Sequence, residues 1–209
     1  MVYKTLAVVM ACWYPLNLYT AFVGFSTAQN IATQARACAY YIAYNAEDDP
    51  DYQTTVTLFL HHVQSLNSDG LTLLHSPKDF NFYTNENDLK AIDSALYRAI
   101  GGDDKFFEAL FYQQSNNGDT PIHYAIRCGN QPWLCVLLKV ALSCSKSCDL
   151  ALVEGLLLIK NKDDETVFDC ALRGKRYYAQ KQYGPLYHDM FKMLKKFKRL
   201  LLKKSKDLY

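Results

Sequence analysis

Cysteine and histidine are the side chains in this sequence that could hold a metal ion or act as nucleophiles. The 209 residues include seven cysteines and five histidines. Zinc needs four nitrogen or sulfur ligands, which often stand in pairs across short spacers. Cys144 and Cys148 form one such pair, and His123, Cys128 and Cys135 precede it without supplying a second pair at a matching distance. We therefore expect no metal and no other cofactor, with a zinc site as the alternative.

The adjacent residues His61 and His62 are a second candidate for metal binding. Consecutive side chains on a helix point about 100° apart, whereas a helical metal site uses two histidines four residues apart. We therefore predict that both histidines lie on the polar face of their helix.

The sequence contains no motif of a known catalytic site. It lacks GxSxG, the phosphate-binding P-loop, HExxH and GxGxxG. The acidic runs 47–51 and 163–165 fall in predicted turns, where carboxylates are normally solvated. An odd number of cysteines at irregular spacing, most of them in apolar surroundings like those of Cys135, is typical of free thiols in a reducing compartment. We expect a cytoplasmic protein that is not an enzyme; the alternative is an enzyme with its site in the N-terminal helical domain.

The most apolar stretch of the chain is residues 6–25. Such a run after Lys4 could be a secretory signal or a membrane-spanning helix. Pro15 and Asn17 interrupt it, which favours two short buried helices that break near the proline. Farther along, apolar residues at helical spacing predict two more helices. These residues are Ile31, Ala35, Cys38 and Ile42, and then Val56, Leu60 and Val63. Together these helices predict an N-terminal helical bundle over residues 1–66.

An internal repeat is the strongest signal in the sequence. Residues 117–130 read Asn-Gly-Asp-Thr-Pro-Ile-His-Tyr-Ala-Ile-Arg-Cys-Gly-Asn, and an apolar helix is predicted over 133–142. This segment closely resembles the ankyrin repeat, in which a Thr-Pro-Leu-His start is followed by Ala, by Gly and by a second, leucine-rich helix.

Each residue of the motif has a mechanical role. Thr120 can cap the first helix, and Pro121 suits its first turn. Ala125 is small enough for neighbouring helices to stack closely, and Gly129 can end the helix in a left-handed turn. The resemblance implies that His123 forms hydrogen bonds within the turn and has a structural role.

Weaker copies of the motif lie on either side. Residues 161–174 match the motif at Thr166, Ala171 and Gly174, but lack its Pro and His. Thr120 and Thr166 are 46 residues apart, which exceeds the ~33 residues of an ordinary ankyrin unit. The difference predicts an insertion around residues 143–149, either a third helix or a longer loop. A helix is predicted after it, over residues 150–159. Upstream, residues 94–103 and 106–111 are predicted as the two helices of another unit. Residues 68–75 echo the start of the motif, and whether they form a true repeat or a loop stays open because Pro77 follows.

The C-terminal segment is basic. Residues 175–209 hold eleven Lys/Arg and two Asp, a charge of +9, whereas residues 1–174 carry −7. Apolar residues recur at spacings of four and three, namely Leu186, Met190, Met193, Phe197 and Leu200. This stripe predicts a helix that caps the repeats. In the alternative, its cations bind an anionic membrane or an acidic partner. That patch would comprise Lys192, Lys195, Lys196, Lys198, Arg199, Lys203 and Lys204.

These observations predict an all-α protein. Residues 1–66 form the N-terminal helical bundle, and residues 67–209 form a short ankyrin-like helical solenoid with the basic capping helix. The resemblance implies protein binding through the concave face and turn tips, as in host-directed effectors of intracellular bacteria, which would place the protein in the host cytoplasm. A membrane-surface adaptor that uses the basic helix is the alternative. Nucleic acid is not expected as a partner, because no reading motif accompanies the charge.

Overall fold

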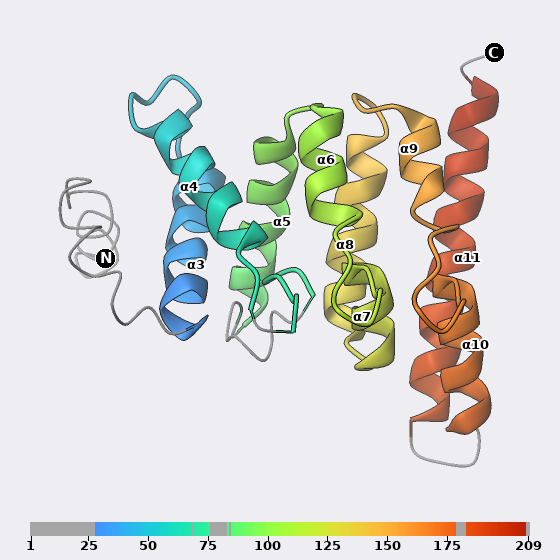
Figure 1. Ribbon diagram of the computed structural model, residues 1–209. Helices are drawn as coiled ribbons and strands as arrows, with labels where there is room; N and C mark the ends of the chain where they lie inside the picture. The colour runs from blue at the N-terminus through green and yellow to red at the C-terminus, as the bar shows by residue number, and fades with distance from the viewer. Residues whose placement is uncertain (1–27, 68, 76–82, 84, 179–182, 208–209) are drawn as a thin grey trace. The chain divides into compact units, whose positions relative to one another are not determined.

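The computed structural model describes residues 28–67, 69–75, 83, 85–178 and 183–207. These residues fold into helices and turns without a strand, so the prediction of an all-α protein is confirmed for them (Figure 1). Contacts divide the chain into two compact units. The first comprises Met1–Ser65 and Pro77–Ala99, and the second Leu66–Ser76 and Ile100–Tyr209. The helices predicted around Pro15 lie outside the described residues.

The first unit contains α3 (Ala28–Tyr44), α4 (Tyr52–Gln64) and most of α5 (Glu86–Ile100). α3 packs against α4. Among residues 31–44 of α3, the fully buried ones are Ala32, Ala35, Ala39 and Ile42. The face predicted for this helix shares only Ala35 and Ile42 with the buried residues. A helix has 3.6 residues per turn, so two stripes that differ by one residue at some positions both fit spacings of four and three.

Two side chains of α5 hold α3. Arg98 Nη1 donates hydrogen bonds to the carbonyl oxygens of Ile42, at 2.7 Å, and Asn45, at 2.9 Å. The guanidinium thereby caps the C-terminal end of α3, where a positive charge is favourable. Asp88 lies near the other end of α5 and accepts a hydrogen bond from the Tyr40 hydroxyl at 2.8 Å.

The second unit contains six helices in the described residues. They are α6 (Asp104–Phe111), α7 (Pro121–Arg127), α8 (Gln131–Cys144), α9 (Leu150–Gly155), α10 (Val167–Tyr177) and α11 (Gly184–Asp207). α8 contacts α7, α9 and α11, and α10 contacts α7 and α11 (Figure 1). Trp133 on α8 is fully buried in this core. Its Nε1 donates to the carbonyl oxygen of Leu74 at 2.7 Å, which anchors residues 69–75 to this unit.

The long helix α11 buries a stripe, but not the predicted one. Its buried side chains are Tyr187, Met190, Leu194, Phe197 and Leu201. Met190 and Phe197 were predicted correctly, whereas Leu200 is 38% exposed and Leu201 takes the buried position beside it. The predicted stripe and the buried stripe both fit the helical period and have Met190 and Phe197 in common. Spacing alone therefore could not show which of the two is buried. α11 packs against α8 and α10.

None of the helices among the described residues is both long enough and apolar enough to cross a membrane.

Candidate functional site

Three turns in the second unit share one backbone geometry. They begin at Asn67, Ser115 and Asn161, and in each the N–H of the first residue donates to the carbonyl oxygen of the fifth at 2.9–3.0 Å. The fourth residue of each turn has a left-handed conformation. These residues are Gly70, Gly118 and Asp164, with φ of 69°, 74° and 60°. The described residues thus contain three copies of the turn, and the copy at 67–72 forms although Pro77, outside the described residues, follows it.

A threonine at the sixth position of each turn bonds to the residue three positions later. Thr72 Oγ1 lies 2.9 Å from His75 Nδ1, and Thr120 Oγ1 lies 2.8 Å from His123 Nδ1. In the third copy Asp169 takes the place of histidine, and Thr166 Oγ1 donates to its Oδ2 at 2.6 Å. The second and third copies are capping boxes, in which the threonine and its partner satisfy the first N–H groups of α7 and α10.

The two histidines connect each turn to the next. The backbone N–H of Thr72 donates to His75 Nδ1, so the other ring nitrogen carries the proton. His75 Nε2 lies 2.9 Å from the carbonyl oxygen of Asp119, and His123 Nε2 lies 3.1 Å from that of Glu165. Burial lowers the pKa of His75 to about 4 and also lowers the pKa of His123, which keeps both rings neutral.

The turns also touch through their backbones. The N–H of Asn116 donates to the carbonyl oxygen of Asp69 at 3.0 Å. Lys162 N–H repeats this contact with Asn117 at 3.1 Å. A Cβ atom on Gly118 would stand 2.7 Å from the nitrogen of Lys162, so glycine is needed both for its φ and for the approach of the next turn.

The other residues of the motif lie as follows. Pro121 opens α7, Ala125 is 1% exposed in the core, and Gly129 has φ 66° just after α7 ends. Ala171 is fully buried on α10. Gly174 is not at a helix end, since α10 continues to Tyr177; a Cβ there would overlap the ring of Tyr187, so Gly174 permits close contact with α11.

The short helix α9, the third after the turn at Ser115, accounts for the long spacing between this turn and the turn at Asn161. α9 ends at Gly155 rather than near residue 159, and α6 occupies the equivalent place 46 residues earlier. Asp103 and Asp149 cap the two helices in the same way, each accepting from the N–H two residues later at 2.8 Å and 2.9 Å. The helix predicted over residues 106–111 is present as α6, and by its position 46 residues before α9 it corresponds to α9 rather than to α8.

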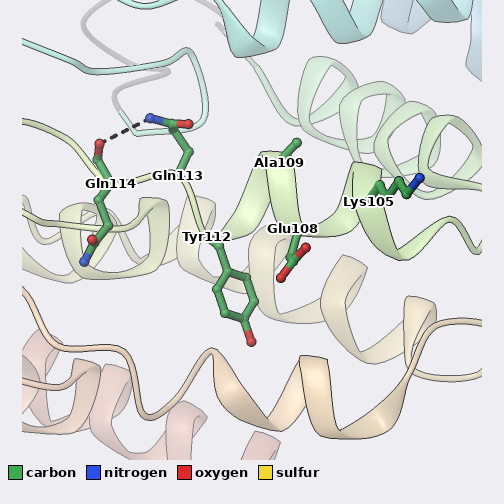
Figure 2. Close-up of a pocket in the computed structure, with 6 residues that line it drawn as sticks. All are labelled: Lys105, Glu108, Ala109, Tyr112, Gln113 and Gln114. Carbon is green, nitrogen blue, oxygen red and sulfur yellow. Dashed lines mark hydrogen bonds between the residues drawn. The ribbon is translucent and has the colours of Figure 1, made fainter.

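An open groove of about 510 Å³ lies along the outer face of α6. Its lining residues are Lys105, Glu108, Ala109, Tyr112, Gln113 and Gln114 (Figure 2). Tyr112 closes one side by donating from its hydroxyl to the carbonyl oxygen of Leu152 on α9 at 2.5 Å. The amide of Gln114 donates to the carbonyl oxygens of Gly118, at 2.8 Å, and Lys160, at 3.0 Å. Gln114 therefore links the turn that begins at Ser115 to the residue before the turn that begins at Asn161. No motif in the sequence marks this groove.

The predicted basic patch on α11 divides into outward and inward side chains. Lys192, Lys195, Lys196, Lys198, Arg199 and Lys203 are exposed. Lys204 instead donates from Nζ to the carbonyl oxygen of Leu142 at 2.8 Å and to Ser145 Oγ at 2.7 Å. Its ammonium group therefore caps the C-terminal end of α8, and burial lowers its pKa.

The candidate metal ligands do not converge among the described residues, which contain no group of three or more His, Cys, Asp or Glu side chains placed to hold an ion. Cys144 and Cys148 are buried, and burial raises the pKa of their thiols to about 12 and about 11. Cys135 is exposed although its neighbours in sequence are apolar. His62 is buried rather than on the polar face, and its pKa falls to about 4.

Comparison with protein-family models, with curated proteins and with solved structures found no match to this chain.

Proposed function

We propose that this chain is a divergent ankyrin-repeat protein with lengthened, three-helix units, and that it is a non-catalytic module for binding another protein. The observation that carries the proposal is the stack of three turns joined by His75 and His123. Such a stack holds neighbouring units in a fixed register, and repeat proteins use the extended surfaces that result to bind partners. A host-cell protein is the partner that the resemblance to bacterial effectors implies.

The groove on α6 and the turn tips beside it form the binding surface in this proposal. The groove combines opposite charges at Lys105 and Glu108 with the amides of Gln113 and Gln114. These groups can pair with the backbone and polar side chains of an extended peptide segment. The tips next to the groove, Asn116 and Asn117, are exposed and polar. A surface of this kind favours a polar peptide over an apolar ligand.

A charge swap tests this surface without altering net charge. The double variant Lys105→Glu/Glu108→Lys reverses the charge pattern of the groove. The control Glu86→Lys/Lys90→Glu makes the same exchange on α5, where the two side chains are exposed and lie 2.9 Å apart. Proteins captured from a cell lysate by the wild-type chain are compared with those captured by each variant, and the melting temperature of each is measured.

We expect the groove variant to lose a protein that the wild type and the control both retain, with its melting temperature unchanged. Retention of every captured protein by the groove variant would contradict the proposed surface. Turnover of a substrate by the purified chain would contradict the non-catalytic role.

A further inference from the structure

The outward face of α11 is strongly basic. Between residues 190 and 206 the sequence has eight Lys or Arg and no Asp or Glu. The exposed cations that share this face are Lys192, Lys195, Lys196, Arg199, Lys203 and Lys206, which we call the basic strip. On a helix that rises 1.5 Å per residue, the strip is about 21 Å long. Two acidic residues flank the strip in sequence: Asp189, one turn before it, whose carboxylate lies 3.6 Å from Lys192, and Asp207, which follows Lys206.

The inner face of α11 is already occupied. Phe197 and Leu201 are 3% and 1% exposed in the core of the second unit. A basic amphipathic helix usually lies on a bilayer with its apolar face among the acyl chains, but here that face is not available. Whatever meets the strip must be recognised by charge at the surface, so binding will weaken as salt is added.

We propose that the basic strip docks the protein onto an anionic membrane surface. The proposal is independent of the groove on α6, since the two surfaces share no residue.

The composition of the strip favours lipid headgroups over a protein or nucleic acid partner. Five of its six cations are lysine, which protein interfaces avoid and which lacks the planar fork that Arg offers to carboxylates and phosphates. Non-specific binding of single strands uses aromatic side chains on which bases stack, and the ring of Phe191 beside the strip is covered by Lys195 Nζ at 4.5 Å from its centroid. Mobile anionic headgroups need neither a fork nor a stacking platform.

Two exposed leucines lie at the margins of the strip. Leu200 is 38% exposed and Leu202 is 47% exposed. With 100° between consecutive helix positions, they fall on opposite sides of the row of cations. Side chains at these positions can enter the headgroup region on either side while the cations contact the lipid phosphates.

The experiment measures sedimentation of the full chain with vesicles of phosphatidylcholine, with and without phosphatidylserine. The strip variant Lys196→Gln/Lys203→Gln/Lys206→Gln is compared with the control Lys105→Gln/Lys139→Gln/Lys162→Gln, which loses the same charge at exposed positions elsewhere. Each lysine near an anionic surface contributes about fivefold to partitioning. We therefore expect the strip variant to bind phosphatidylserine vesicles roughly a hundredfold more weakly, and the control to bind like the wild type. Circular dichroism verifies that both variants are folded.

The proposal is overturned if the wild-type chain does not sediment with phosphatidylserine vesicles, or if the strip variant and the control bind them equally. Binding to duplex DNA or to polyglutamate at salt concentrations that release the protein from vesicles would also overturn it and would assign the strip to that class of polyanion.

Discussion

His75 Nε2 donates a hydrogen bond to the carbonyl oxygen of Asp119, 44 residues further along the chain, at 2.9 Å. The ring is 1% exposed, and its other nitrogen accepts from Thr72. Both bonds require the neutral ring in this tautomer.

Acid should therefore destabilise the second unit. The pKa of His75 is about 4 in the folded chain, against an ordinary value near 6.5. Above pH 6.5 the ring is neutral in both states and its stabilisation is complete. As pH falls from 6.5 to 4, the unfolded chain takes up a proton that the folded chain does not, so the free energy of unfolding decreases, by about 3 kcal/mol for this residue. Urea unfolding at a series of pH values, followed by Trp133 fluorescence in a Trp13→Phe background, measures the slope.

The variant His75→Asn isolates this effect. It should be less stable than the parent at pH 7, because buried bonds are lost, yet its stability should decline less between pH 6.5 and 4. The exposed His61→Asn variant should keep the slope of the parent. An unchanged slope in His75→Asn would show that the acid sensitivity arises elsewhere.

Equivalent turn positions should respond in opposite ways to substitution. Gly118→Ala introduces a Cβ at φ 74° and 2.7 Å from the nitrogen of Lys162, so it should lower the free energy of unfolding by at least ~1 kcal/mol. Asp164→Gly removes a side chain at φ 60° that is 82% exposed, and should leave stability the same or raise it by up to ~1 kcal/mol. Chemical denaturation measures both. Equal losses in the two variants would contradict the different roles of these turns.

Adjacent leucines on α11 test its packing. Leu201→Ala should cost about 2–5 kcal/mol because the side chain is buried, whereas Leu200→Ala, at a position 38% exposed, should change stability by about 0.5 kcal/mol. Deleting residues 185–209 should expose the core along α8 and α10 and abolish cooperative melting of the second unit. A truncated chain that stays monomeric and melts at the full-length temperature would refute the capping role of this helix.

The positions of the helices could be predicted from the sequence better than the side of each helix that is buried. The motif around Thr120 and His123 has enough specific residues to locate a capped helix, and the apolar stripe from Leu186 to Leu200 locates α11. Burial is decided by neighbours that lie far away in sequence. The Leu200 and Leu201 positions differ by 100° on a helix, and only the position of α8 and α10 decides which one is buried.

In the candidate site, too, local pairs of residues could be predicted from the sequence, whereas contacts between turns could not. The spacing that Thr120 and His123 share also relates Thr72 to His75, but Pro77 left both a repeat and a loop open for residues 68–75. The bond from His75 to Asp119 depends on the stacking of turns, which no local pattern encodes. The groove on α6 could not be predicted either, since its lining residues have no distinctive spacing.

The third turn has Asp164 and Asp169 where the first two have glycine and histidine, and this difference determines where further copies of the turn and its helices can be added. The 46 residues from 115 to 160 contain a turn, three helices, a glycine that leaves room for another turn and an imidazole that reaches it. Because this block begins and ends at equivalent backbone positions, a tandem duplication would present matching contacts to both neighbours. The third turn offers no such continuation, since Asp169 has no ring and Asp164 places a Cβ where glycine stands in the other two. Extending the array by engineering beyond that point would require Asp164→Gly and Asp169→His together.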